Sequence, residues 1–263
     1  MEHIQSKDNL LIKEIKKLKE KKYRVISNMF LVEGFRFTEE ALESDFEVVH
    51  IFISAKGESK FENSSVKNKL QENTKVYSLS DSLFKGICDT DNPQGIIAVV
   101  RNKPVAIKYD YGFYILADKI QDPGNMGTII RTAHAAGALG VIITKGTVDI
   151  YNEKTLRSTM GSIFKIPVIE DKDLSLVQKL RDSGFKLVTS SLDTDKNFYD
   201  IDLKEKVIIS VGNEGNGISD EVYELSDLKI KIPMPGGAES LNAAVAASIM
   251  MYEVVRQKNN IEF

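Results

Sequence analysis

The chain has 263 residues, of which 42% are hydrophobic and 28% charged, and its formal net charge is -3. This composition is that of an ordinary globular protein, with material for one large domain or two modest ones. The single cysteine, Cys88, excludes an intramolecular disulfide framework and a cysteine-based metal cluster, and we expect no metal site. Apolar runs stay below the ~18–20 residues of a membrane span, and the charged start lacks a signal-peptide core, so we expect a cytoplasmic protein without membrane contact.

The chain begins with a basic segment. Residues 7–24 hold eight lysines and arginines against three acids, and Leu11, Ile15 and Leu18 recur at helical spacing. This pattern predicts a helix with one apolar face and a basic remainder, which suits contact with nucleic acid phosphates or an anionic membrane. An ordinary solvated lysine-rich helix explains the same pattern.

The rest of the first hundred residues alternates between helix and strand. After a short apolar stretch at residues 29–33, we expect a turn at Gly34, a helical run, two short apolar strands at 48–53 and 96–100, and a loose helix within 56–75. Asn102-Lys103-Pro104 breaks the pattern, and the linker is expected at about residues 101–110. The predicted domains are therefore residues 1–103 and 104–263.

The second part is richer in buried-strand signals. Four short β-rich runs, at residues 113–117, 141–144, 186–190 and 207–211, are separated by helical segments. This alternation predicts an α/β domain in which helices cover a parallel sheet.

Three loops at strand ends carry polar residues. The first follows residues 113–117 and leads into a helix for which Asn125 is a suitable cap. Its glycines do not have the G-x-G-x-x-G spacing of dinucleotide sites. Thr128, Arg131 and His134 recur every third residue and share one helix face, so the arginine could reach back toward whatever the loop holds, or form a surface ion pair.

The second loop follows residues 207–211 and sets an acid, Glu214, among Gly212, Gly215 and Gly217. A carboxylate beside a polyphosphate would cost affinity by like-charge repulsion. The loop therefore suits a neutral or cationic ligand, or a carboxylate that fixes neighbouring backbone amides. S-adenosylmethionine, which carries a sulfonium and no phosphate, meets that description.

The third loop lies before the last helix. Two prolines stiffen residues 230–235, a Gly-Gly pair makes a tight bend, and Ser240 or Asn242 can cap the helix that follows. For these two polar residues a role in the site competes evenly with capping.

Taken together, the three loops resemble the SpoU (TrmH) family of RNA 2′-O-ribose methyltransferases, within the SPOUT superfamily. Its motifs are matched by NMGTIIR at residues 125–131, NEGNGIS at 213–219 and IPMPGGAESLN at 232–242. The segments YRVISNMFLVEGFRFTEEAL and TDNPQGIIAVV resemble the family's L30e-like substrate-binding domain and the exit from it. The resemblance covers nearly the whole chain.

The resemblance implies an L30e-like α/β domain followed by a parallel-sheet α/β domain with a deep trefoil knot. The cofactor would be S-adenosylmethionine, and the enzyme would be a homodimer that joins through the catalytic domain. Carried over to this sequence, the catalytic residues are Asn125, Arg131, Glu214, Ser240 and Asn242. The residues that bind the cofactor through main-chain groups are Gly212, Ile232 and Leu241.

In the expected reaction a ribose 2′-hydroxyl attacks the sulfonium methyl. A guanidinium with a pKa above ~12 is a poor base, so we expect Arg131 to hold the neighbouring phosphate and stabilise the developing alkoxide. Asn125 would orient the nucleophile, and Glu214 would position Arg131 or the loop. His134 is a further candidate for proton transfer.

The expected substrate is a structured RNA bound through the N-terminal domain and the basic segment 7–24, with 23S rRNA favoured over tRNA. Two rival functions come from other classes. One is an RNA-binding protein without catalytic activity, which would not need the polar residues of the loops. The other is an NAD-dependent oxidoreductase, against which the glycine spacing and Glu214 both count.

Overall fold

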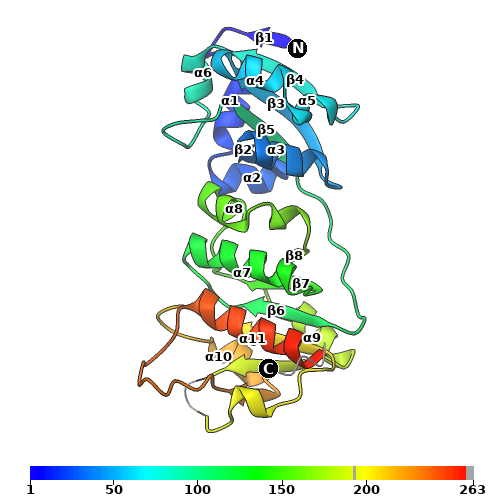
Figure 1. The fold of residues 1–263 in the computed structure, drawn as a ribbon, viewed down its shortest axis with the longest axis vertical. Coiled ribbons are helices and arrows are strands. Elements are labelled where there is room, and N and C mark those ends of the chain that lie inside the picture. The colour runs from blue at the N-terminus through cyan, green and yellow to red at the C-terminus, as the bar shows by residue number, and fades with distance from the viewer. Residues whose placement is uncertain (192–193, 259–263) are drawn as a thin grey trace. The chain divides into compact units, whose positions relative to one another are not determined.

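The computed structural model describes residues 1–191 and 194–258. The chain forms two compact units (Figure 1): Met1–Pro104 with Tyr151–Phe164, and Val105–Ile150 with Lys165–Phe263. The first break falls between Pro104 and Val105. Tyr151–Phe164 belongs to the first unit although it lies inside the predicted second domain, and the roles assigned to the two domains stay predictions.

The first unit is built on a five-stranded mixed sheet in the order β1-β4-β3-β5-β2. β4 is parallel to β1 and β3, and β5 is antiparallel to β3 and β2. The strands are β1 (Glu2–Ile4), β2 (Met29–Glu33), β3 (Glu47–Ser54), β4 (Lys75–Leu79) and β5 (Ile96–Arg101).

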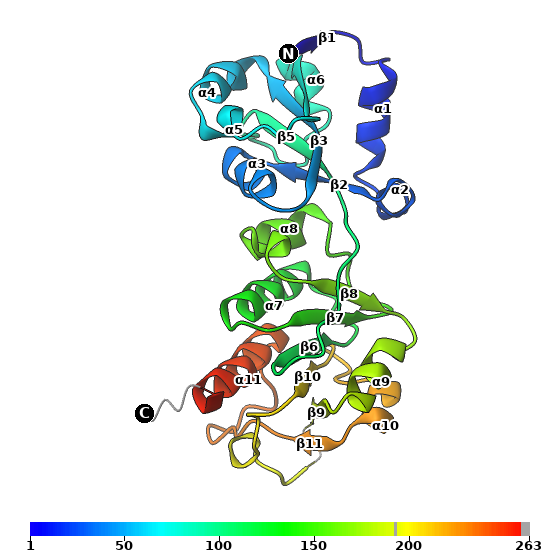
Figure 2. The same cartoon turned by 90° about the vertical axis from the view of Figure 1, so that its right-hand side faces the viewer.

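Helices cover both faces of this sheet (Figure 2), with α1 on one face and α3, α4 and α5 on the other. The helices of the unit are α1 (Leu10–Lys17), α2 (Lys21–Ser27), α3 (Phe35–Leu42), α4 (Glu58–Glu62), α5 (Ser65–Asn68), α6 (Asp81–Lys85) and α8 (Glu153–Thr159). The predicted turn at Gly34 is present, with φ of +104° at the start of α3. The predicted helix within residues 56–75 consists of two short helices, α4 and α5.

The single helix predicted for residues 7–24 is wrong, because the chain forms two helices there. α1 ends at Lys17, and Arg24 Nη1 donates to the carbonyl oxygens of Leu18 (2.6 Å) and Lys19 (2.7 Å), which pins the turn before α2. The guanidinium satisfies carbonyls that helix propagation would otherwise pair. α1 buries Ile12 and Ile15, whereas α2 buries no residue.

The second unit contains the predicted parallel sheet, which has six strands in the order β11-β9-β10-β6-β7-β8. All neighbouring pairs are parallel. The strands are β6 (Phe113–Ala117), β7 (Gly140–Thr144), β8 (Val168–Asp171), β9 (Lys186–Ser190), β10 (Val207–Val211) and β11 (Leu228–Ile230). The sequence did not reveal β8 and β11, because β8 is short and half polar and β11 has three residues.

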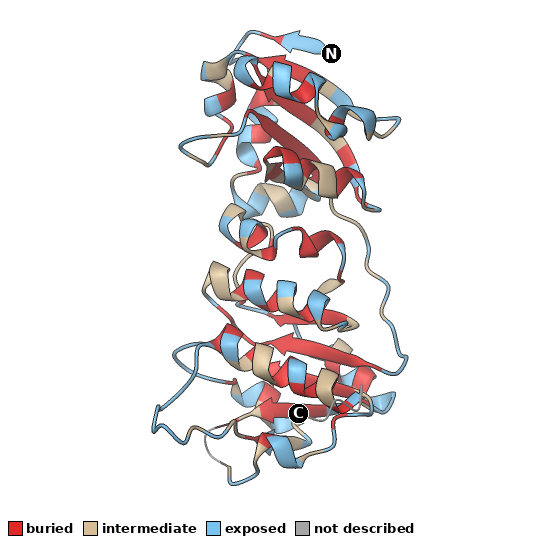
Figure 3. Cartoon of the chain, viewed as in Figure 1, coloured by how far each residue is buried: buried red, intermediate tan, exposed pale blue. Residues whose placement is uncertain are grey.

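Helices lie on both faces of this sheet, α7 (Pro123–Ala135) and α11 (Ala243–Lys258) on one and α9 (Ser175–Asp182) and α10 (Asp220–Leu225) on the other (Figure 2). β6, β7 and β10 are buried along their whole length (Figure 3) because helices cover them on both sides. In the part of the chain that the structure describes, no helix is long and apolar enough to cross a membrane.

Candidate functional site

The candidate site lies where the strands of the second sheet end. β6, β7 and β10 are adjacent and parallel, so the loops that follow them emerge at one edge of the sheet. Ligands of open parallel sheets bind beyond the carboxyl ends of the strands. Two of the three loops singled out in the sequence, after β6 and after β10, are brought together here.

The loop after β6 delivers Asn125 to the first turn of α7. The predicted cap at Asn125 is wrong, because Asp122 caps the helix and accepts a hydrogen bond from the Asn125 backbone amide at 2.8 Å. Pro123 explains the difference, since proline suits the first helical position and the cap therefore precedes it. The side chain of Asn125 is consequently available for other contacts.

In the glycine loop, which we define as residues 212–219, the backbone at the start of the loop packs directly against the backbone at its end. A Cβ at Gly212 would lie 2.2–2.4 Å from main-chain atoms of Gly217 and Ile218, so only glycine fits there. Asn213 and Gly217 exchange two backbone hydrogen bonds of 2.8 and 2.9 Å, which close the loop. The side chain of Asn213 accepts from the amides of Gly215 and Asn216 and donates to the Lys119 carbonyl.

Glu214 is anchored to the loop after β6. Its carboxylate accepts from Asn125 Nδ2 at 2.8 Å and from the Gln121 amide at 3.3 Å. Desolvation pushes the pKa of Glu214 upward, but hydrogen bonds from Asn125 and from backbone amides outweigh it, and the pKa lies below its usual 4.5. Glu214 is therefore ionised at neutral pH, and its negative charge disfavours a polyphosphate in the same loop.

Asn242 completes a chain of three side chains. Of the two predicted caps for α11, Asn242 makes the contacts: its Oδ1 accepts from the amides of Ala244 (2.9 Å) and Val245 (3.2 Å). Its Nδ2 donates to Asn125 Oδ1 at 2.9 Å. The Glu214–Asn125–Asn242 chain thus joins all three loops, and it assigns the oxygen and nitrogen of the Asn125 amide.

Two predicted site residues stand outside this chain. Arg131 is exposed on α7 together with Thr128 and His134, as the helical spacing indicates. Ser240 is exposed before α11. Among the described residues, the side chains of Arg131 and Ser240 form no hydrogen bond or ion pair, and the contacts of Glu214 are with Gln121 and Asn125 of the loop after β6 rather than with Arg131.

The three residues expected to bind the cofactor lie at the same edge. Gly212 and Ile232 are half-buried, and Leu241 is 37% exposed. Within residues 1–191 and 194–258, no hydrogen bond engages their main-chain groups. Such unpaired donors and acceptors fit a purine and an amino acid moiety, both of which are recognised through neutral hydrogen bonds, so these residues suit S-adenosylmethionine.

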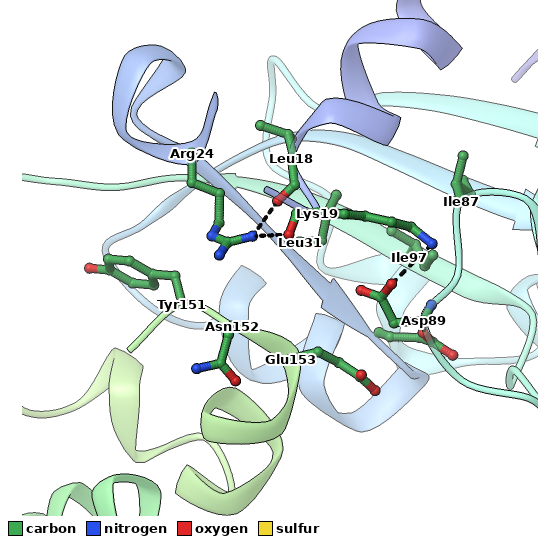
Figure 4. A pocket seen from close by; sticks show the side chains of 11 residues that line it. Leu18, Lys19, Arg24, Leu31, Ile87, Asp89, Ile97, Tyr151, Asn152 and Glu153 are labelled. Atoms are coloured by element: carbon green, nitrogen blue, oxygen red, sulfur yellow. Dashed lines mark hydrogen bonds and ion pairs between the residues drawn. The ribbon is translucent and has the colours of Figure 1, made fainter. Parts of the chain in front are cut away.

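A separate pocket of about 60 Å³ lies in the first unit, beside the end of α1 and the start of α8 (Figure 4). Lys19, Arg24, Asp89 and Glu153 are among its lining residues, and Lys19 pairs with Asp89 at 3.0 Å. Its volume is far below the ~300 Å³ of ordinary ligand pockets. The predicted site residues lie in the other unit, so this pocket takes no part in the site. Among the residues that the structure describes, no group of three or more acidic, histidine or cysteine side chains could hold a metal ion.

Sequence reasoning missed several polar residues that hold the loops together. Asp118 directly follows the buried strand β6, Thr144 is the last residue of β7, and their side chains bond to each other; Asn213 organises the glycine loop. The available signals were an aspartate directly after an apolar run and an asparagine two residues before a glycine, where its side chain can cap the turn.

Comparisons with known proteins agree with the motifs. The model of the SpoU rRNA Methylase family matches residues 112–252, and that of the MRM3-like substrate binding domain matches residues 9–98. The chain is 38% identical over 254 residues to the 23S rRNA (guanosine(2553)-2′-O)-methyltransferase RlmP of Bacillus subtilis, covering 97% of this chain and 99% of that protein.

Solved structures show the same architecture. The AdoMet-bound rRNA methyltransferase from Sinorhizobium meliloti superposes with a TM-score of 0.86 at 30% identity, covering 97% of both chains. The SpoU methyltransferase AviRb from Streptomyces viridochromogenes, in complex with AdoMet, gives a TM-score of 0.87 at 29% identity and covers 97% of this chain and all of that chain (100%).

Proposed function

The chain belongs to the SpoU rRNA methylase family, and from this premise we propose that it methylates a ribose 2′-hydroxyl of 23S rRNA with S-adenosylmethionine as the methyl donor. It is an RNA 2′-O-ribose methyltransferase. Among this chain's own residues, the proposal rests on the Glu214–Asn125–Asn242 hydrogen-bond chain at the carboxyl edge of the parallel sheet. A binding protein without chemistry would not need three polar side chains held in one orientation.

The cofactor supplies an electrophilic methyl group on a sulfonium. We assign its binding to the main-chain groups of Gly212, Ile232 and Leu241, which are otherwise unpaired among the described residues. The ionised Glu214 in the same loop suits a cofactor that carries a positive charge and no phosphate.

Asn125 orients the attacking hydroxyl in this proposal. Its Nδ2 gives one hydrogen to Glu214, and its Oδ1 accepts one from Asn242. An amide has two N–H groups and two lone pairs, so one of each remains for the substrate. The remaining lone pair on Oδ1 can accept the hydrogen of the 2′-hydroxyl and hold the oxygen for attack.

Arg131 contributes positive charge at the site. It is exposed and has no ion-pair partner among the described residues, so its guanidinium is available to an RNA phosphate. There it would hold the phosphate next to the reacting ribose and stabilise the developing alkoxide. The proton of the hydroxyl then passes to a phosphate oxygen or to water, with His134 as a further candidate. Ser240 stays a predicted catalytic residue.

The first unit is assigned to RNA binding. α2 buries no residue, and the ammonium groups of Lys17 and Lys22 lie 5.5 and 5.7 Å from the ring centre of the half-buried Tyr23. Lysines beside a partly exposed aromatic ring suit phosphates and stacked bases. We favour ribosomal RNA over tRNA as the substrate because a relative that is 38% identical and matches 97% of this chain is named as acting on 23S rRNA.

We also propose a homodimer, formed through the second unit and placing the site near the interface. Exposed apolar side chains on α11, Val245 (48%) and Tyr252 (52%), support it. The deep trefoil knot near the C-terminus and the cytoplasmic location, where ribosomal RNA is modified, belong to the same proposal. Sedimentation of the purified protein tests the dimer.

The activity is tested by methyl transfer from radiolabelled S-adenosylmethionine to unmodified 23S rRNA, 16S rRNA and tRNA, with Arg131→Ala as the control. We expect label on 23S rRNA, at one ribose that resists alkaline cleavage, and none with the variant. Label on tRNA alone would make the chain a tRNA methyltransferase. Absence of both label and cofactor binding would favour an RNA-binding protein without activity.

A further inference from the structure

We propose that Asp118 is a positioning residue of this methyltransferase: its buried carboxylate anchors the end of the glycine loop and so sets the place of Glu214. Asp118 directly follows β6 and is fully buried, with 0% of its surface exposed. Its effect on cofactor binding rests on the proposed function, whereas its effect on the loop does not.

The carboxylate of Asp118 bridges two different loops. Oδ1 accepts from the Thr144 hydroxyl at 2.7 Å, and Oδ2 accepts from the Ser219 backbone amide at 2.7 Å. In the described part of the chain it has no cationic partner. A buried carboxylate without a cation is costly, and hydrogen bonds from an amide and a hydroxyl are what make it tolerable.

The hydroxyl of Thr144 also stabilises a strained turn at Lys119. Lys119 has φ of +53°, a left-handed conformation that a side chain other than glycine adopts at a cost. Its amide donates to Thr144 Oγ1 at 2.9 Å, and its carbonyl accepts from Asn213 Nδ2 at 2.8 Å. Asp118, Thr144 and Lys119 therefore form one network that reaches the glycine loop.

This network controls where Glu214 lies. The glycine loop starts at the end of β10 and ends at Ser219, whose amide Asp118 holds. Between these two fixed points Glu214 reaches across to Asn125 and Gln121. Loss of the hydrogen bond between Asp118 and the Ser219 amide would make the loop more mobile. Glu214 and the main chain of Gly212 would then no longer be held in one position.

The second sheet offers a matched control. Asp171 is also a buried aspartate at the end of a strand, β8, and it accepts a backbone hydrogen bond of 2.9 Å from Val177 in α9. Asp118→Asn and Asp171→Asn remove the same charge from similar surroundings. Only the first acts on the candidate site.

We would measure four quantities in the full-length protein: the Tm, hydrogen exchange of the segment 212–220, the Kd for S-adenosylmethionine, and the KM values for cofactor and RNA. For Asp118→Asn we expect faster exchange in that segment, a cofactor Kd and KM raised roughly tenfold, and an RNA KM within about twofold of the wild type. We expect Asp118→Asn and Asp171→Asn to lower the Tm by similar amounts. In Asp171→Asn, however, the hydrogen exchange of the loop and the cofactor Kd should stay unchanged.

A second pair of variants keeps the test open should Asp118→Asn not fold. Thr144→Val removes the hydroxyl that bonds Asp118, and Thr144→Ser keeps it. We expect the valine variant to reproduce the loosened loop and the serine variant to behave as the wild type.

The proposal is overturned if Asp118→Asn leaves loop exchange unchanged, or if Asp171→Asn affects the loop and the cofactor equally. It is also overturned if Thr144→Ser and Thr144→Val loosen the loop to the same degree. A wild-type protein that binds no S-adenosylmethionine would instead refute the proposed function, and loop exchange would still decide the anchoring role of Asp118.

Discussion

Asn125 Nδ2 donates a hydrogen bond of 2.8 Å to Glu214 Oε1, joining two residues that lie 89 positions apart in the chain. This bond explains the acid among the glycines. Glu214 fixes the amide of Asn125 and the backbone of Gln121, and its charge is compatible with a sulfonium cofactor. Asn125 in turn accepts from Asn242, so the orientation of one amide depends on three loops.

Arg131→Lys separates charge from geometry. Lysine keeps the positive charge but loses the planar fork that binds a phosphate through two hydrogen bonds. We expect turnover at saturating RNA to fall by roughly 10²-fold, with the cofactor Kd within about twofold of the wild type. Arg36→Lys, at an exposed arginine of α3 that pairs with Glu40, is the control and should retain activity. Near-normal turnover of Arg131→Lys would refute the role given to Arg131.

Two substitutions at Asn242 distinguish its two contacts. Asn242→Asp keeps the acceptor that caps α11 but loses the donor to Asn125, whereas Asn242→Ala loses both. Loss of a cap costs about 1 kcal/mol. We therefore expect both variants to lose most turnover in the methyl-transfer assay, but only the alanine variant to show a clearly lower Tm. An active Asn242→Asp variant would mean that the bond to Asn125 is dispensable.

Gly212→Ala tests the close backbone packing within the glycine loop. The added Cβ would lie 2.2–2.4 Å from main-chain atoms of Gly217 and Ile218, which cannot be relieved by a rotamer change. We expect a lower Tm and a cofactor Kd raised at least about tenfold, measured by calorimetry. Gly215→Ala is the steric control, because its Cβ would first meet Asn213 Oδ1 at 3.6 Å. Equal losses of Tm in the two variants would mean that the close contact of residue 212 with the backbone of Gly217 and Ile218 is not the cause of the destabilisation.

The lowered pKa of Glu214 predicts a pH dependence. Desolvation raises this pKa, but hydrogen bonds from Asn125 and backbone amides lower it further than that, to below 4.5. The ionised form therefore stabilises the fold above pH 4.5, and this contribution disappears as the pH falls through the lowered pKa. The Tm of the wild type should exceed that of Glu214→Gln at pH 7, by at most ~4 °C for an exposed group, and the difference should disappear once the pH has fallen through the lowered pKa of Glu214. A difference that persists there would contradict the assignment.

Lys21 and Lys22 on α2 are predicted to contact RNA phosphates. Replacing both with glutamine should reduce the slope of log Kd for RNA against log salt by roughly 1.4–1.8, since each phosphate contact contributes ~0.7–0.9. The control is Lys172→Gln with Lys179→Gln, two exposed lysines of the second unit. An unchanged slope in the α2 variant would exclude this helix from the RNA interface.

Most elements of the second unit could be predicted from the sequence. The runs that became β6, β7 and β10 are mostly apolar because a parallel sheet covered on both faces leaves no polar side, whereas β9 begins at the exposed Lys186 and buries only its three central residues. The motifs also indicated which loops carry polar residues. Predictions failed where the local sequence is compatible with two structures. Asp122 rather than Asn125 caps α7, and residues 7–24 form two helices instead of one.

The amino-acid sequence by itself determined which segments are buried, where the loops lie and to which family the chain is similar, because these depend on the local order of residues. Only the tertiary structure decided which side chains meet. The strand order placed β10 beside β6, and that adjacency brought Glu214 to Asn125 and Ser219 to Asp118. A hydrogen bond requires two atoms within about 3 Å of each other, and no local pattern specifies that distance between residues a hundred positions apart.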